Sequence, residues 1–327
     1  MKKIAIIGTG LSGLTLGRDL NSIAEVTFFE KSKGVGGRLA TRRVKDFSFD
    51  HGAQFFTVKT PEFREFVNSL KKKNIVERWD ARFAEFQMSK LVHTKQWESE
   101  YPHYVGSPNM NSIGKYLSKD MKINLNTKIK SIDSKSNNWV VTDDKGNTHG
   151  NFDWIVLAIP PKQVIEIIPI EFKYFNELKN IKMLGCYSLL LGFNYDIQFP
   201  FDAALVREAK ISWISINSSK PSRNKNFTMV VNSTNKWADE NMNMSDNEVK
   251  KYLLNETTRV LNKDFSNVKI IDLQRWRYAN ISKQKYLKPL IDKDNRLAVC
   301  GDWCMQGRVE FAFLSSKKVI EEIVDYL

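Results

Sequence analysis

The residues best suited to chemistry lie near the start of the chain, where Gly8, Gly10 and Gly13 have the GxGxxG spacing. They follow a short apolar run and precede a helical pattern of leucines, so the segment predicts a strand, a tight turn and a helix. Such a turn brings the N–H groups of a helix N-terminus to a pyrophosphate. Glu30 ends the next predicted strand, where a carboxylate can accept hydrogen bonds from ribose hydroxyls. Residues 2–31 therefore predict a dinucleotide site, and both NAD and FAD remain possible.

A second group of glycines and arginines follows in KGVGGRLATRR. Glycines allow the backbone to approach a ligand closely, and guanidinium groups pair with phosphate in a planar, forked geometry. A plain NAD-dependent dehydrogenase does not need this second cluster, and the alternative is a flexible basic loop. The residues concerned are Gly34, Gly36, Gly37, Arg38, Arg42 and Arg43.

The next motif, FSFDHGAQFFTV, predicts a strand that ends in small residues. Gly52 and Ala53 suit a backbone that passes close to a planar ligand, and Gln54 is a candidate for the pocket lining. Phe55 and Phe56 could line the same pocket, and a position in the hydrophobic core is an equally good alternative for them.

The end of the chain has a similar logic to its start. Residues 297–300 predict a buried strand, Gly301 and Asp302 a turn, and a helix runs from about Arg308 to Tyr326. Asp302 is a candidate to hold a ribityl hydroxyl. The helix N-terminus is a candidate to stabilise negative charge on a reduced isoalloxazine ring. The alternative is an ordinary βα unit with a capping aspartate.

The composition of the 327 residues is that of a globular protein with about two domains, because 42% are hydrophobic and 27% are charged. We expect a soluble cytoplasmic protein without a membrane segment, since no apolar run approaches the roughly 20 residues that cross a bilayer. The net charge of +13 is spread over many lysines, so a solvated basic surface is favoured over nucleic-acid binding. Neither the three cysteines nor the four histidines have the spacing of a metal site or a disulfide framework.

The pattern along the chain predicts an α/β fold: a Rossmann-type domain interleaved with a smaller α+β substrate domain on a mostly antiparallel sheet. Helices are expected at 61–73 and 246–261, with Ser245 or Asp246 as the N-cap of the second. The predicted nucleotide-binding domain comprises residues 1–60, 104–165 and 290–327. The predicted substrate domain comprises residues 61–103 and 166–289, including a strand before LQRWRYAN.

Taken together, the motifs resemble the bacterial renalase-type flavoproteins within the amine-oxidase-like FAD superfamily. Motifs that extend over the whole chain carry the resemblance, and the combination GDWC, GRVE and AFLS is the most specific of them. They are GTGLSG, KGVGGRLATRR, FDHGAQFF, YVGSPNMN, RWRYA and CGDWCMQGRVEFAFLSS.

The resemblance implies noncovalent FAD and oxidation of 2- or 6-dihydro isomers of NAD(P) to β-NAD(P)+, with O2 as electron acceptor and H2O2 as by-product. It implies a nicotinamide dinucleotide as partner. We expect a monomer or dimer and, because a dihydropyridine is already a hydride donor, no essential acid or base. The FAD-binding residues implied are Gly8, Gly10, Leu11, Ser12, Gly13, Glu30, Lys31, Gly37, Arg38, Gln54, Gly301, Asp302, Arg308 and Val309. Those facing the substrate are Gln54, Trp276 and Tyr278.

Three alternatives remain open on the sequence. A flavin amine oxidase would use the same FAD domain but needs an aromatic cage or a cation-binding carboxylate. A carotenoid-type desaturase needs a membrane-binding apolar patch, for which no stretch is evident. A non-enzymatic sensor would bind FAD or NAD without turnover.

Overall fold

The computed structural model describes residues 1–282 and 288–327. The described residues form two compact units, and each unit takes segments from separate parts of the chain. The first unit contains residues 1–39, 113–183 and 281–327, and the second contains residues 40–112 and 184–280.

A six-stranded sheet forms the centre of the first unit, in the order β19-β20-β13-β1-β2-β9. Neighbouring strands are parallel except for β19, which is antiparallel to β20. All four residues of β13 are buried, as expected for a parallel strand that is covered on both faces. The strands are β1 (Lys2–Ile7), β2 (Ala24–Phe29), β9 (Lys122–Asn124), β13 (Trp154–Leu157), β19 (Leu290–Asp292) and β20 (Leu297–Val299).

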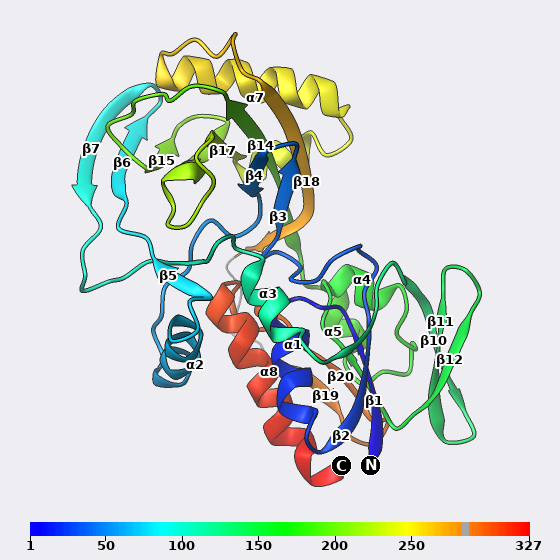
Figure 1. Cartoon of the computed structure of the whole chain (residues 1–327). Coiled ribbons are helices and arrows are strands. Elements are labelled where there is room, and N and C mark those ends of the chain that lie inside the picture. Colours follow the sequence, from blue (N-terminus) through cyan, green and yellow to red (C-terminus); the bar gives the residue numbers. More distant parts are fainter. Residues whose placement is uncertain (283–287) are drawn as a thin grey trace. The chain divides into compact units, whose positions relative to one another are not determined.

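The helices of the first unit surround this sheet, and α1 and α8 lie side by side in Figure 1. The hydroxyl of Ser12 in α1 donates a 2.7 Å hydrogen bond to the carbonyl of Ala312 in α8. An antiparallel meander of three strands completes the unit. The helices are α1 (Leu11–Leu20), α3 (Ser112–Leu117), α4 (Pro161–Ile165), α5 (Phe175–Lys179), α8 (Val309–Ile323) and the 3-10 helices η2 (Asp302–Met305) and η3 (Val324–Tyr326). The meander strands are β10 (Ile129–Lys135), β11 (Asn138–Asp143) and β12 (Thr148–Phe152).

A seven-stranded sheet forms the second unit, in the order β18-β14-β17-β16-β15-β6-β7. Its registers are antiparallel between β14, β17, β16 and β15, and parallel between β15 and β6. Two short strand pairs, β3–β4 and β5–β8, accompany it. The strands are β3 (Thr41–Val44), β4 (Phe47–Asp50), β5 (Val76–Arg78), β6 (Arg82–Gln87), β7 (Lys90–Gln96), β8 (Tyr104–Gly106), β14 (Met183–Phe193), β15 (Ala203–Arg207), β16 (Ile211–Ile216), β17 (Phe227–Ser233) and β18 (Ile270–Ile281).

Helix α7 packs its apolar residues into the main core of the second unit. Its N-cap is Ser245, which forms a capping box with Glu248, and Asn262 ends the helix in the left-handed conformation. The predicted boundaries and N-cap of this helix are therefore confirmed. The helices of this unit are α2 (Pro61–Lys71), α6 (Asn235–Glu240), α7 (Asp246–Leu261) and the 3-10 helix η1 (Asn217–Ser219).

The predicted fold class, a Rossmann-like α/β unit with a mostly antiparallel second sheet, is confirmed, although the second unit is slightly larger than the first and not smaller. The compact units also differ from the predicted domains. Residues 40–60 fall in the second unit because Phe47 packs where Gly192 has no side chain: a Cβ there would lie 2.7 Å from the phenyl ring. Residues 166–183 fall in the first unit, whose core includes Ile168 and Leu178. Part of the predicted segment 166–289, residues 283–287, lies outside the described residues.

One strand prediction needs correction. LQRWRYAN lies inside the long strand β18 and does not follow a separate strand. Trp276 and Tyr278 are two residues apart on this strand, so they share a face of the sheet. Among the described residues, no helix combines the length and apolar character that a membrane span requires.

Candidate active site

The glycine turn of the first unit has the geometry of a dinucleotide cradle. Gly8 has a φ of +102°, and a Cβ at Gly13 would lie only 2.2 Å from the Gly8 carbonyl oxygen, so both positions require glycine. A Cβ at Gly10 would meet no protein atom within 4 Å, which leaves open space in front of the backbone. Gly10 is also the N-cap of α1 and forms no side-chain cap. The N–H groups of the first turn, which includes Leu11, are therefore available to an anion.

Glu30 lies directly after β2, and its carboxylate holds this turn from behind. One carboxylate oxygen accepts hydrogen bonds from the N–H and the hydroxyl of Thr9, at 3.0 and 2.7 Å, and the other accepts one from the N–H of Ser32 at 2.8 Å. A carboxylate has about four acceptor positions, so one remains for a ribose hydroxyl. Lys31 follows and is exposed.

The second glycine loop packs against the first one, although α1 and β2 separate the two loops in the sequence. The N–H of Gly36 donates a 2.8 Å hydrogen bond to the carbonyl of Thr9. A Cβ at Gly37 would lie 3.0 Å from the Cα of Gly10. Both Gly36 and Gly37 have positive φ angles, +108° and +54°, which favour glycine. The structure thus brings the first two predicted motifs together.

Arg38 and Asp302 come together from opposite ends of the chain. One guanidinium nitrogen of Arg38 donates a 2.9 Å hydrogen bond to a carboxylate oxygen of Asp302, and a second nitrogen pairs with the other oxygen. The sequence assigned these residues separately to a phosphate and to a ribityl hydroxyl. In the structure the bidentate pair fixes both side chains beside the glycine loops.

A second helix N-terminus is available in the same unit. Strand β20 leads through Gly301 and η2 to α8, whose first residue is Val309 and whose N-cap is Arg308. Arg308 is exposed and forms no side-chain cap, and the buried Glu310 lies in the first turn of this helix. Two uncapped helix N-termini and two glycine loops fit a ligand with a pyrophosphate and a second electron-rich group.

The remaining arginines of the GGRLATRR cluster, Arg42 and Arg43, belong to the second unit. Arg42 lies in β3 of the second unit, where it forms an ion pair with Asp272 at 2.9 Å and donates a hydrogen bond to the side chain of Gln274. Arg43 is exposed on the same strand. A phosphate contact of Arg42 stays a prediction, and in the structure its guanidinium pairs with the Asp272 carboxylate.

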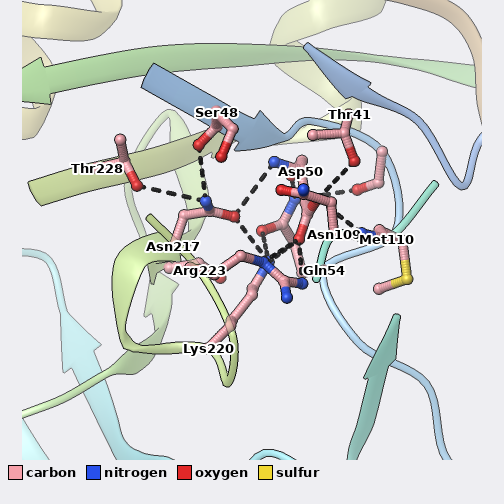
Figure 2. Close-up of polar contacts among 12 residues, drawn as sticks. Thr41, Ser48, Asp50, Gln54, Asn109, Met110, Asn217, Lys220, Arg223 and Thr228 are labelled. Atoms are coloured by element: carbon pink, nitrogen blue, oxygen red, sulfur yellow. Dashed lines mark hydrogen bonds and ion pairs between the residues drawn. The ribbon is translucent and has the colours of Figure 1, made fainter. Parts of the chain in front are cut away.

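In the second unit, a buried polar cluster surrounds Asp50 at the end of β4. Figure 2 shows the side chains of Arg223 and Lys220 converging on its carboxylate. Arg223 donates two hydrogen bonds to one oxygen, at 3.1 and 2.6 Å, and the Lys220 ammonium lies 3.6 Å from that oxygen. The other oxygen accepts hydrogen bonds from the hydroxyl of Thr41 and the N–H of Met110, at 2.7 and 2.9 Å. Every side of the carboxylate is occupied.

The charges of this cluster are fully buried, and their pKa values respond to one another. Burial alone would raise the pKa of Asp50, but Lys220 and Arg223 together with the hydrogen bonds hold it below its usual value. Burial lowers the pKa of Lys220 to about 8, and Asp50 offsets only part of that effect. Lys220 and Arg223 lie in a loop that reads as a solvated basic segment, NSSKPSRNKN, so the sequence offered no signal for either of them.

Gln54 belongs to this cluster, and its amide is used within the second unit. Its nitrogen donates hydrogen bonds to the carbonyls of Asp50 and Gly52, at 2.6 and 3.0 Å, and its oxygen accepts one from Lys220 at 3.2 Å. The N–H of Asp50 also donates to the side chain of Asn217 at 3.2 Å. Through these contacts Gln54 stabilises the turn that runs from Asp50 to Gln54, which we call the 50–54 turn.

His51 lies in the 50–54 turn and forms a pair with Trp276. The two rings stack with centroids 5.2 Å apart and an angle of 18°, and the indole N–H donates a 2.8 Å hydrogen bond to the His51 carbonyl. Burial, with help from Arg42, lowers the pKa of His51 to about 4, so its ring is neutral at pH 7. In the sequence, His51 is one of four scattered histidines, and no pattern there indicates a contact between His51 and Trp276. Tyr278 lies on the same face of β18 and is half-buried.

The described residues contain no candidate metal centre. Among the residues that the structure describes, no group of three or more potential metal ligands occurs. The three cysteines are buried, and burial raises the pKa of their thiols, to about 11 for Cys186 and about 12 for Cys300. At pH 7 these buried thiols are therefore protonated.

Comparisons with known proteins agree with this geometry. Residues 6–70 match the NAD(P)-binding Rossmann-like domain, and residues 98–324, more than half of the chain, match the flavin containing amine oxidoreductase family. A protein assigned as a protoporphyrinogen oxidase, from Exiguobacterium sp. 255-15, is similar with a TM-score of 0.80 at 12% identity, over 100% of this chain and 99% of that one. Wild-type putrescine oxidase bound to putrescine is similar with a TM-score of 0.73 at 11% identity, over 99% of both chains.

Proposed function

Because the chain belongs to the flavin containing amine oxidoreductase family, we propose that it oxidises dihydronicotinamide dinucleotides in the manner of renalase-type enzymes. Its cofactor is noncovalent FAD, for which the first unit supplies the glycine turn, Glu30 and two uncapped helix N-termini. The proposed substrates are the 2- and 6-dihydro isomers of NAD(P), which differ from β-NAD(P)H in the ring carbon that carries the hydride.

The observation that carries this proposal is the net charge of the ion pairs formed by Asp50 and Asp272, two carboxylates near His51. The nearby carboxylates of Asp50 and Asp272 are both ion-paired, the first with Lys220 and Arg223 and the second with Arg42. Within these ion pairs three cations face two carboxylates, so the paired groups together carry one excess positive charge. An ammonium ion is disfavoured beside this charge, whereas the phosphates of a dinucleotide are favoured. The arrangement therefore supports an anionic nucleotide better than an amine.

The chemistry places few demands on the protein. A dihydropyridine is already a hydride donor, and loss of the hydride restores an aromatic pyridinium, so orientation of the ring is the main requirement. When bound, FAD would supply the hydride acceptor and the route by which the electrons reach O2. The balanced reaction converts dihydro-NAD(P), O2 and one proton into NAD(P)+ and H2O2. The 50–54 turn supports this proposal, since Gln54, Ser188 and Trp276 fix its carbonyl groups by hydrogen bonds.

Anaerobic mixing tests the proposal directly. The holoenzyme is mixed with NAD+ that has been reduced by borohydride, which contains the dihydro isomers, and with pure β-NADH as the control. We expect rapid bleaching of the flavin absorbance with the isomer mixture and little with β-NADH, and formation of NAD+ and H2O2 once air is admitted. Bleaching by neither nucleotide would contradict the proposal.

A flavin amine oxidase is the second candidate, and one observation favours it. Phe55, Trp97, His103 and Trp213 form an aromatic cluster in the second unit, in which the Trp97 and His103 rings stack 3.6 Å apart. Faces of aromatic rings can bind an alkylammonium group. The same anaerobic experiment with putrescine and with simple primary amines separates the candidates, because bleaching by an amine alone would select this one.

A further inference from the structure

We propose that His51 is a substrate-binding residue, whose neutral imidazole donates a hydrogen bond to the carboxamide group of the dihydronicotinamide ring. This inference rests on the proposed function, because it names the contact by which the same site would recognise its substrate. The evidence is the rigid placement of His51, an unpaired ring nitrogen and the electrostatics of its surroundings.

The backbone on both sides of His51 is held by buried side chains. The His51 carbonyl accepts hydrogen bonds from the hydroxyl of Ser188 at 2.9 Å and from the indole of Trp276 at 2.8 Å. Gln54 binds the preceding and following carbonyls, those of Asp50 and Gly52. Such complete fixation is typical of a group that must be presented in one orientation.

The imidazole, in contrast with the backbone, has an unsatisfied polar atom. Its Nδ1 is buried and has no hydrogen-bond partner among the described residues. Leaving a lone pair unpaired there costs less than leaving an N–H unpaired, since orphaned N–H groups are the rarer of the two in proteins. A neutral imidazole carries one proton, so the proton is favoured on Nε2. His51 therefore offers an Nε2–H donor that has no hydrogen-bond partner among the described residues.

The surroundings keep this donor neutral. Trp276 stacks on one face of the ring, and the charged groups near it are Arg42, Asp50 and Asp272, which are all ion-paired. A neutral donor suits an uncharged carbonyl acceptor, and the carboxamide is the uncharged polar group of a nicotinamide ring. Recognition of this group would hold the ring in register without charge, while the ion pairs of Asp50 and Asp272, which include Lys220, Arg223 and Arg42 and carry one excess positive charge, would attract the phosphates.

Substitution of His51 tests the contact. In His51→Leu we expect KM for the dihydro isomers to rise about tenfold while the flavin spectrum and FAD content stay those of the wild type, because one hydrogen bond is lost. His51→Gln restores an N–H donor and should recover part of the affinity. The matched control is His93→Leu on exposed strand β7, for which we expect wild-type kinetics.

A binding measurement identifies the group that is recognised. NAD+ and thionicotinamide adenine dinucleotide differ only in the acceptor atom of this group. It is oxygen in NAD+ and sulfur, a weaker hydrogen-bond acceptor, in the analogue. Titrations monitored by the flavin spectrum should show a roughly tenfold loss of NAD+ affinity in His51→Leu and a smaller loss for the thioamide. Equal losses for both nucleotides, or His51→Leu affinities that match those of His93→Leu, would overturn the inference.

These outcomes separate the inference from the function on which it rests. Wild-type protein that binds NAD+ through His51 but does not oxidise the dihydro isomers would contradict the proposed function alone. Wild-type protein that oxidises the isomers with His51→Leu unaffected would contradict the inference alone. Wild-type protein that does not bind NAD+ would contradict both.

Discussion

The indole nitrogen of Trp276 donates a 2.8 Å hydrogen bond to the backbone carbonyl of His51, and the same indole stacks on the His51 ring. One side chain on β18 thus fixes both the backbone and the ring of a residue that lies more than 200 positions earlier in the chain. The relationship supports a positioning role for Trp276, and the substrate-facing role that the resemblance implied for it stays a prediction.

Trp276→Phe should separate the two parts of this relationship. The phenyl ring preserves the stacking and loses the hydrogen bond, so we expect a loss of about 1 kcal/mol in the free energy of unfolding. KM for the dihydro isomers should rise a few-fold while kcat changes little, since the His51 ring becomes less well fixed. Urea denaturation and steady-state kinetics measure the two effects, and an unchanged KM would argue against the positioning role.

Asp50 is expected to be the most sensitive residue of the buried cluster. Asp50→Asn leaves Lys220 and Arg223 buried without a carboxylate, which should cost about 3–5 kcal/mol in the free energy of unfolding. Arg223→Met keeps the Asp50–Lys220 pair and should cost less, about 1–3 kcal/mol. The matched control is Arg82→Ala, which breaks a pair whose arginine is 52% exposed and should change stability by about 0–1 kcal/mol. A reversed order of the two cluster variants in urea denaturation would contradict this account.

Lys220 should make stability depend on alkaline pH. Its pKa is about 8 in the folded protein and 10.5 for an unperturbed lysine, so the unfolded chain binds more protons between these values. The cost of burying the ammonium is complete below pH 8 and decreases as the pH rises above 8. The contribution of Lys220 to the free energy of unfolding should therefore increase by up to about 1.4 kcal/mol per pH unit across this window. Urea denaturation at pH 7.5, 9 and 10 measures the trend, which should flatten in Lys220→Met.

Gly10→Ala distinguishes a ligand contact from a folding requirement. Gly10 has a φ of −69°, and a Cβ there meets no protein atom within 4 Å, so the apoprotein should tolerate alanine without loss of stability. We expect FAD affinity to fall at least tenfold because the methyl group occupies the space in front of the cradle. Gly34→Ala, whose Cβ also meets nothing within 4 Å, serves as the control. FAD titration and thermal unfolding of the apoproteins check this, and unchanged FAD affinity in Gly10→Ala would place the pyrophosphate elsewhere.

Denaturation should release the flavin completely. The cysteine thiols are buried and protonated, so we expect no covalent link to the ring. After acid precipitation the yellow colour should remain in the supernatant and match authentic FAD by chromatography. Colour retained in the precipitate would show a covalent bond.

The sequence by itself determined the local parts of the molecule. The GxGxxG turn, the acidic residue after β2, the N-cap of α7 and the terminal βα unit depend on residues a few positions apart, and each was predicted correctly. Local spacing suffices there because backbone sterics, caps and hydrophobic periodicity act within one or two turns of chain.

Only the tertiary structure decided which of these residues meet. The pairs Arg38–Asp302 and His51–Trp276, and the convergence of Lys220 and Arg223 on Asp50, join residues separated by more than 160 positions. A lysine in a polar loop reads as solvated, and its burial depends on a carboxylate contributed by a distant strand. The sequence therefore specified the nucleotide cradle, whereas the charge and the hydrogen-bonding groups of the proposed substrate site arise from packing, because burial and pairing are properties of the folded chain.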